Sequence, residues 1–441
     1  MSLSTLAGRA FDLARRPAVR GIVGVVALKA SIIAVNFALI FLAARLLGAH
    51  DFGAYSILFS AAGLCGVAAT FGQQMLVMRS WSEYAGPSDA GLLKGSLLFS
   101  TGICLIGAMM TFAGFVLWTR VTTEADAAWP VAAYAGLLTL VLFTSHLVRS
   151  AVGVGRGDGY ANIASALPPV LYLAACWAMG WQADLAGTFL FYALGLLLAL
   201  VVHVGSMAFT LGRRPDFAAA APRIDLAAWR PRSWKLWLSS MLEAANQYLD
   251  VLIVGLLLSP SVAGAYFVTT RLANAFATAS DALNMFSTRH IPDLHFRRDK
   301  VALRALLDSI SWMTALMIAG GLLVIAVGGP FLLRAFNPDY ASYYPALIVL
   351  SVGTAAAAGA GPSASVLMLT GHEGRYLSIM AVALATRALG FFLLIPTFGL
   401  MGAVVATAVS FTIMAWQLAR SSKRLAGLDC SVGRLVGTRT P

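Results

Sequence analysis

Residues 185–211 read LAGTFLFYALGLLLALVVHVGSMAFTL and contain no Asp, Glu, Lys or Arg. A helix rises about 1.5 Å per residue and the hydrocarbon core of a bilayer is about 30 Å thick, so about 20 such residues form one membrane span. The whole chain resembles this stretch, because 59% of its 441 residues are hydrophobic and only 11% are charged. Soluble domains carry about 25% charged residues. The sequence therefore predicts an all-α, polytopic membrane protein.

Further apolar runs of similar length precede and follow this stretch along the chain. A window of span length identifies about twelve transmembrane helices, which leaves only short connections between them. No connection is long enough for a separate folded domain, so the fold consists of the membrane helices themselves. The predicted spans are residues 21–47, 53–77, 93–117, 128–148, 161–180, 185–211, 236–258, 262–287, 303–327, 344–369, 376–394 and 400–418.

The positive charges are distributed unequally between the two sides of this map. With a cytoplasmic N-terminus, 25 of the 31 Lys and Arg residues lie on the inner side or at inner span ends. Only Arg45, Arg120 and Arg334 lie on the outer side. Cytoplasmic loops carry the excess of Lys and Arg in membrane proteins. The distribution therefore predicts a multi-pass protein of the cell inner membrane with both termini in the cytoplasm.

An internal repeat divides the chain into halves. Leu46-Leu47 followed by Gly53-Ala54-Tyr55 recurs as Leu257-Leu258 followed by Gly264-Ala265-Tyr266, 211 residues later. Six spans in each half give the halves the same orientation, which predicts two parallel repeats related by an axis along the membrane normal. The expected organisation is an N-terminal cytoplasmic segment (1–20), a first six-helix bundle (21–212), a cytoplasmic linker (213–235), a second six-helix bundle (236–420) and a cytoplasmic tail (421–441).

Tryptophans in and after the linker, and prolines inside two spans, give two further predictions. Trp229, Trp234 and Trp237 are typical of residues that anchor a protein at the membrane interface. Prolines free backbone groups and bend helices, so Pro168-Pro169 is expected to interrupt the fifth span and Pro362 the tenth.

Several classes of function find no support in the motifs. The four cysteines show no CxxC or metal-ligand spacing, and the glycine-rich loop at 153–159 follows a span and lacks the lysine of a phosphate-binding loop. No hydrolase motif is present, so we expect neither catalytic residues, nor a cofactor, nor a metal, and the protein is not expected to be an enzyme. Topology accounts for the basic balance, which gives no indication of nucleic-acid binding.

Polar residues inside the seventh span fall on one helical face. Ser239, Glu243, Asn246 and Asp250 follow an i, i+4, i+7, i+11 spacing, and Gln247 lies beside them. The stripe is either the wall of a cavity, with Glu243 or Asp250 binding a cation or a proton, or a hydrogen-bonded clamp to another span. Both interpretations remain open, and Asp281 in the eighth span is a third candidate for ion coupling.

Buried cations form the second informative set. An ionisable residue at the bilayer centre costs about 2.5–3.5 kcal/mol on insertion scales, so it usually faces a cavity or a partner. Arginine suits bidentate binding of phosphate, which favours a cavity for an anionic headgroup. Pairing with Asp250 or Asp281 to hold helices together is the alternative. The candidate substrate-binding residues are Lys29, Asn36, Arg149, Arg271, Arg387, Asn246 and Gln247; Asn36 and Gln247 are 211 residues apart and so place amides at equivalent positions of the two halves.

Several segments resemble the polysaccharide flippases of the multidrug/oligosaccharidyl-lipid/polysaccharide exporter superfamily. LAARLLGAHDFGAYSILFSAAGL (42–64) and FGQQMLVMRS (71–80) are similar to the start of such proteins. YLDVLIVGLLLSPSVAGAYFVTTRLAN (248–274) resembles their seventh and eighth spans, and IPDL (291–294) follows. LLIPTFGLMGAVVATAVS (393–410) resembles their turn between spans eleven and twelve. The matches occur in order along nearly the whole chain.

The resemblance implies a bundle of six plus six helices around a central cavity. It also implies a flippase that moves a polyprenyl-diphosphate-linked oligosaccharide from the cytoplasmic to the outer leaflet by alternating access, for O-antigen or exopolysaccharide assembly. The lipid-linked oligosaccharide and the membrane would be its partners, with a glycan polymerase and glycosyltransferases as further candidates. The alternatives are a multidrug/cation antiporter of the same superfamily and an integral-membrane glycan polymerase or ligase.

Overall fold

The computed structural model describes residues 17–121, 125–275 and 300–435, and these residues form helices and short connections without a strand. The predicted all-helical fold is therefore confirmed, and each of the twelve predicted spans overlaps a helix. The helix that begins at residue 260 is described as far as residue 275. The other helices are α2 (Pro17–Leu46), α3 (Gly48–Ala69), α4 (Gln73–Glu83), α5 (Ala90–Val121), α6 (Ala128–Ala151), α7 (Tyr160–Met179), α8 (Leu185–Gly212), α9 (Pro215–Ala219), α10 (Leu226–Leu257), α12 (Lys300–Phe336), α13 (Tyr344–Gly359), α14 (Ser363–Leu369), α15 (Glu373–Phe398) and α16 (Leu400–Ser421).

Length and apolarity qualify most of these helices as membrane spans. Within the described part of the chain, nine helical segments are long and apolar enough to cross a bilayer. The outward faces of these helices carry large apolar side chains such as Met109, Leu316 and Phe331, which are 71%, 74% and 76% exposed. Apolar side chains on the outside of a helical bundle are expected where the solvent is lipid.

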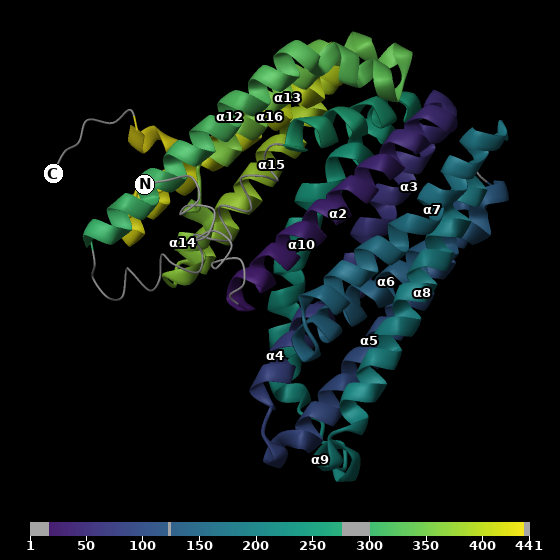
Figure 1. Ribbon diagram of the computed structural model, residues 1–441, viewed down its shortest axis with the longest axis vertical. Helices are drawn as coiled ribbons and strands as arrows, with labels where there is room; N and C mark the ends of the chain where they lie inside the picture. The colour runs from purple at the N-terminus through teal and green to yellow at the C-terminus, as the bar shows by residue number, and fades with distance from the viewer. Residues whose placement is uncertain (1–16, 122–124, 276–299, 436–441) are drawn as a thin grey trace, which may run out of the picture. The chain divides into compact units, whose positions relative to one another are not determined.

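The helices form two compact units. The first contains the described residues of Met1–Leu47 and Ala62–Met241, and the second contains those of Gly48–Ala61 and Leu242–Pro441. In the first unit, α6 packs against α5 and α8 (Figure 1). In the second, α13 packs against α12 and α16, and α15 against α16 (Figure 1). The division predicted from the sequence differs from these units in two places: it assigns residues 48–61 to the first bundle and residues 236–241 to the second.

The repeated Gly-Ala-Tyr motif explains why residues 48–61 belong to the second unit. Gly53 of α3 lies against the backbone of Pro260, so closely that a side chain at position 53 would overlap the Pro260 carbonyl. A Cβ atom on Gly264 would lie 3.1 Å from the Gly53 Cα atom, so the two repeat glycines face each other at a helix crossing. Small residues allow the backbones of membrane helices to approach this closely. The flanking Tyr55 and Tyr266 are 1% and 0% exposed.

Two predicted spans are broken helices. The second predicted span consists of α3 and α4, because Phe71 and Gly72 adopt left-handed conformations with φ of 46° and 75°. The tenth consists of α13 and α14, which end and begin around Pro362 as the sequence predicted. By contrast, Pro168 and Pro169 lie inside the continuous helix α7, so the predicted interruption of the fifth span is wrong.

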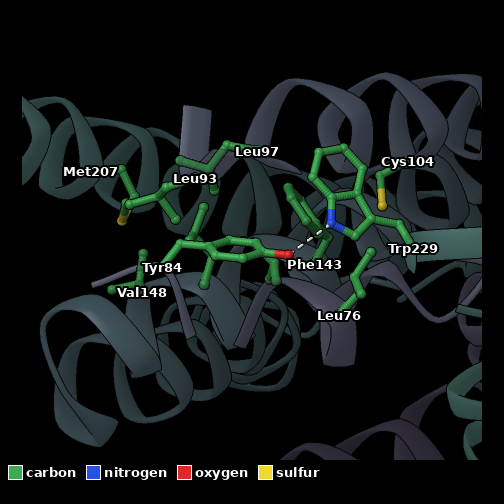
Figure 2. Close-up of a cluster of buried hydrophobic side chains, with 11 residues drawn as sticks. Leu76, Tyr84, Leu93, Leu97, Cys104, Phe143, Val148, Met207 and Trp229 are labelled. Atoms are coloured by element: carbon green, nitrogen blue, oxygen red, sulfur yellow. Dashed lines mark hydrogen bonds between the residues drawn. The ribbon is translucent and has the colours of Figure 1, made fainter. Parts of the chain in front are cut away.

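A buried aromatic pair fixes the cytoplasmic linker of the sequence map to the first unit. Figure 2 shows Trp229 among the side chains of α4, α5, α6 and α8, where its indole N–H donates a hydrogen bond to the Tyr84 hydroxyl over 3.2 Å. Trp229 is fully buried, so its predicted role as an interfacial anchor is wrong, whereas Trp234 is 61% exposed. Helix α10 already begins at Leu226, and position 229 lies on the side of this helix that packs against the apolar cluster.

An ion-pair cluster at the end of α4 gives the first unit a pH-dependent contact. The Arg232 guanidinium lies 3.0 and 3.1 Å from the two carboxylate oxygens of Glu83, and Arg79 Nε lies 3.1 Å from one of them. Partial burial alone would raise the pKa of Glu83, but the hydrogen bonds and charges of Arg232 and Arg79 outweigh it and hold that pKa below its usual value. The ionised form of Glu83 is therefore favoured in the folded protein.

The stabilising contribution of Glu83 should consequently be lost in acid. A group with a lowered folded pKa contributes stability above its unfolded pKa, here about 4.3 for Glu, and loses it as the pH falls through the folded pKa. We expect Glu83→Gln to lower the midpoint of thermal unfolding at about pH 7. The difference from wild type should shrink at about pH 3. Calorimetry or fluorescence in detergent measures both midpoints, and a difference that is equal at both pH values would contradict the assignment.

Candidate functional site

A cavity of about 310 Å³ lies within the second unit, between α10, the helix from residue 260, α13, α15 and α16. Its wall combines aromatic and aliphatic side chains with hydroxyls, amides, one carboxylate and two guanidinium groups. Polar groups in this number are unusual inside a bundle whose helices are otherwise apolar, and they define the candidate site. The polar lining residues are Asn246, Gln247, Asp250, Tyr266, Thr270, Arg271, Asn274, Thr354, Arg387 and Thr407.

Arg387 and Asp250 form an ion pair at this cavity. Arg387 Nε lies 3.1 Å from Oδ1 of Asp250, and their side chains are only 2% and 12% exposed. The two residues come from α15 and α10, which the sequence separates by 137 positions. A buried charge without a partner costs several kcal/mol, so each side chain makes the other tolerable at this depth. The pair thus connects the seventh and eleventh predicted spans.

The polar stripe of α10 supplies a second contact to the same guanidinium. Arg387 Nη2 donates a hydrogen bond of 2.7 Å to the side-chain oxygen of Asn246, one helical turn before Asp250. On the other side of Asp250, the hydroxyl of Tyr266 donates to its carboxylate over 3.3 Å and lies 2.9 Å from the Thr407 hydroxyl. Asn246 and Asp250 therefore form the clamp between spans that was one interpretation of the stripe. Both residues also line the cavity.

The guanidinium of Arg387 keeps unused donors. Its five N–H groups are fixed in a planar fork. Nη1 is buried and has no hydrogen-bond acceptor among the described residues, and the Nε–H makes no well-directed hydrogen bond despite its ion-pair distance to Asp250. Buried donors are almost always satisfied in proteins, so an unused donor beside a cavity indicates a group that the cavity receives.

Arg271 adds a second positive charge to the cavity wall. Its guanidinium lies 4.9 Å from the ring centroid of Phe267, and it forms no ion pair with any residue in the described ranges. With Arg387 balanced by Asp250, the cavity retains the charge of Arg271. Two guanidinium groups with amides beside them can hold an anion through charge-assisted hydrogen bonds, which are about twice as strong as neutral ones.

The remaining candidate residues of the sequence lie elsewhere or outside the described side chains. Gln247 is exposed and lines the cavity, whereas Glu243 is exposed but not among the lining residues. Asp281 lies outside the described residues, and the Lys29 side chain is likewise not described, although its backbone belongs to α2.

Arg149 and Asn36 belong to the first unit. Arg149 lies 2.9 Å from the carboxylate of Asp158, which also accepts a hydrogen bond of 2.8 Å from Ser145. The side chain of Asn36 donates to the carbonyl of Ile32 in its own helix. Their roles in substrate binding stay predictions, and neither lines the cavity of the second unit.

Sequence reasoning did not select Tyr266 or Thr407 as site residues. Tyr266 belongs to the repeated motif, which was used only to divide the chain into two halves, and Thr407 lies in an ordinary apolar run. The part of the chain that the structure describes holds no group of three or more His, Cys, Asp or Glu residues suited to a metal ion.

Comparison with known families extends these observations to the whole chain. The model of a family described as "Polysaccharide biosynthesis protein" matches residues 23–292, which is more than half of the sequence. No curated protein matches the chain significantly.

Solved structures share the fold at low sequence identity. An inward-facing multidrug resistance MATE family transporter of the MOP superfamily has a TM-score of 0.71 at 13% identity, over 89% of this chain and 95% of that chain. The lipid II flippase MurJ, in an inward closed conformation, has a TM-score of 0.66 at 11% identity, over 90% and 86%. A MOP superfamily transporter from Pyrococcus furiosus has a TM-score of 0.60 at 13% identity, over 90% and 93%. That transporter is described as having a binding pocket of reverse polarity.

Proposed function

Because the chain belongs to the polysaccharide biosynthesis protein family and has the fold of membrane transporters and flippases, we propose that it moves a lipid-linked oligosaccharide across the inner membrane. The cargo is a polyprenyl-diphosphate-linked oligosaccharide, which passes from the cytoplasmic to the outer leaflet by alternating access. The product serves O-antigen or exopolysaccharide assembly, where glycosyltransferases supply the substrate and a glycan polymerase uses it.

The observation that carries this proposal is the unused Nη1 donor of Arg387 beside Arg271 in the cavity of the second unit. Each phosphate group of a diphosphate presents pairs of acceptor oxygens that a guanidinium can bind in a bidentate manner. The described lining residues of the cavity carry a positive charge in excess, which opposes a cationic drug because like charges repel strongly where the dielectric constant is low. An anionic headgroup is therefore favoured over the cargo of a multidrug/cation antiporter.

The proposed direction depends on the orientation of the chain. The excess of Lys and Arg on one side of the map supports cytoplasmic termini and a cytoplasmic location for residues 213–235. A reporter that functions only in the cytoplasm should be active when it is fused within residues 213–235. Activity there of a reporter that functions only on the outer side would reverse the proposed direction.

Removing the cavity charge tests the headgroup site. We expect Arg271→Ala to reduce flipping of a fluorescent polyprenyl-diphosphate oligosaccharide in proteoliposomes at least about tenfold, because one charge-assisted hydrogen bond to phosphate is worth about 1.5–3 kcal/mol. Insertion and folding should be unchanged, since Arg271 has no carboxylate partner among the described residues.

The matched control is Arg304→Ala, which removes an exposed arginine of α12 in the same unit. Its flipping rate should equal that of wild type. Wild-type flipping by the Arg271 variant would remove the headgroup site from this cavity.

A further inference from the structure

The first unit carries a separate groove that the proposed transport cavity does not use. It has a volume of about 890 Å³ and lies between α5 and the start of α10, beside the break between α3 and α4. We call it the α5 groove. Its lining residues are Phe71, Gln73, Phe99, Ile103, Ile106, Met110, Leu226, Arg230, Pro231, Ser233, Trp234 and Trp237.

The α5 groove runs along one helical face. Phe99, Ile103, Ile106 and Met110 follow the i, i+4, i+7, i+11 spacing that places side chains in a row. Eleven steps of about 1.5 Å give a row of about 16 Å. This length is about half of the ~30 Å hydrocarbon core, so the row can accommodate a hydrocarbon segment about as long as one leaflet is thick.

A stack of three aromatic rings forms the facing wall. The ring centroids of Phe71 and Trp237 are 6.1 Å apart with an interplanar angle of 17°, and those of Trp237 and Trp234 are 4.9 Å apart with an angle of 29°. The Trp237 indole N–H donates to the carbonyl of Ala68 over 2.9 Å, which fixes the central ring. The wall is therefore formed before any ligand enters.

The polar groups below the groove are already satisfied by each other. The amide of Gln73 donates to the Ser233 hydroxyl over 3.2 Å and accepts from the Ser100 hydroxyl over 2.9 Å. These contacts join α4, α5 and α10 and leave an almost entirely apolar surface for a ligand. A sugar or a peptide would find few hydrogen-bond partners along this row, whereas a hydrocarbon chain requires none.

The lining of the groove includes an available cation. Arg230 is exposed and forms no ion pair within the described ranges, whereas Arg232, two positions later, pairs with Glu83. Arg230 lies in the segment whose sequence places it at the cytoplasmic surface, next to the exposed ring of Trp234. An apolar row with an available cation in its lining matches a single hydrocarbon chain that ends in an anionic group.

We propose that the α5 groove binds the polyprenyl chain of the carrier lipid, with the phosphate of the lipid at Arg230. This inference rests on the proposed function, because that function supplies a single-chain anionic lipid as cargo. A two-chain phospholipid would leave one of its chains outside the single row.

Photocrosslinking of the full chain tests the α5 groove directly. The probe is a polyprenyl phosphate with a diazirine on its chain, at low mole fraction in nanodiscs of phosphatidylethanolamine. We expect mass spectrometry to find the label on peptides that contain residues 99–110 and 226–237. Ile106→Trp, which fills the row, and Arg230→Gln, which removes the cation, should each reduce this labelling several-fold.

The matched control is Leu105→Trp. Leu105 is exposed on the same helix and does not line the groove. The Leu105→Trp protein should be photolabelled at the groove as strongly as the wild-type protein is. Two competitors are compared in excess: phosphatidylglycerol and unlabelled polyprenyl phosphate. If phosphatidylglycerol displaces the probe equally well, the groove binds an ordinary phospholipid and the proposal is overturned. Label spread evenly over the lipid-facing helices would overturn it as well.

Flipping is measured with the same variants, so that the two proposals can fail separately. Groove labelling by a wild-type protein that flips no lipid-linked oligosaccharide would support the groove and contradict the proposed function. Flipping by a wild-type protein without groove labelling would overturn the groove alone. Arg271→Ala should lose flipping and keep the groove label, because Arg271 belongs to the other cavity.

Discussion

Replacement of Arg387 by leucine is expected to destabilise the second unit by about 3–5 kcal/mol. The substitution leaves the Asp250 carboxylate buried without its cation, and the single hydrogen bond from Tyr266 does not neutralise that charge. Asn246 loses its 2.7 Å hydrogen bond to Arg387 at the same time. A lower midpoint of thermal unfolding in detergent, together with a reduced monodisperse yield, measures the loss.

The double variant Asp250→Leu/Arg387→Leu separates the ion pair from the rest of the site. Replacing both charges of a buried pair by apolar residues is often neutral, so most of the stability should return. Arg271→Leu provides the matched control, because this second cavity arginine has no carboxylate partner in the described part of the chain. A double variant as unstable as Arg387→Leu alone would show that the pair is not what stabilises this position.

Flipping by these variants tests whether the pair also has a role in transport. The double variant should fold without regaining transport, because it lacks the Arg387 donors that the cavity offers to an anion. Full flipping by the folded double variant would make Arg387 and Asp250 a clamp alone. The two interpretations of the polar stripe in the seventh span are thereby resolved by one pair of measurements.

Replacement of Gly53 by leucine is expected to prevent the crossing of α3 with the helix from residue 260. The atoms that the new side chain would meet are the backbone carbonyl of Pro260 and the nitrogen of Ser261, which cannot move aside as a flexible side chain can. Overpacking usually costs about 1–3 kcal/mol, and a clash with backbone belongs at or above the top of that range. Loss of folded protein after membrane extraction, measured by size-exclusion fluorescence, should be nearly complete.

Gly114 of α5 is the matched control position. A Cβ atom there would meet no other atom within 4 Å, so Gly114→Leu should be extracted and should unfold as wild type does. Leucine is also the better helix former by several tenths of a kcal/mol. Equal yields of the Gly53 and Gly114 variants would show that the repeated glycines are not required for the helix crossing.

The sequence predicted the helices well because the bilayer imposes a strong and simple requirement. Backbone groups in hydrocarbon must be bonded within their own segment, so each apolar run of sufficient length is a helix. The helices differed from the prediction where backbone conformation, which a hydropathy window does not measure, decided whether a helix is continuous. The left-handed conformation at Gly72 divided the second span, whereas Pro168 and Pro169 were accommodated inside α7.

The candidate site could be predicted in part, for reasons that differ between its residues. The spacing of Asn246 and Asp250 placed both on one face of α10, since positions in a helix have a fixed angular relation. The pairing of Asp250 with Arg387 was one of two open interpretations of the buried charges. Tyr266 and Thr407 gave no signal of a site, because aromatic and hydroxyl side chains are common in apolar spans.

The sequence by itself determined an all-helical membrane protein, the approximate position of each span, and the presence of charges that a bilayer tolerates only in a cavity or a pair. These properties depend on local composition and on the thickness of the hydrocarbon core, which any window of residues reports. Only the tertiary structure decided that Arg387 meets Asp250 and Asn246, and that Gly53 meets Gly264. It also placed Phe99 to Met110 opposite a stack of tryptophans. Such contacts join residues far apart in the chain, and they are fixed by how helix surfaces pack, which no local pattern records.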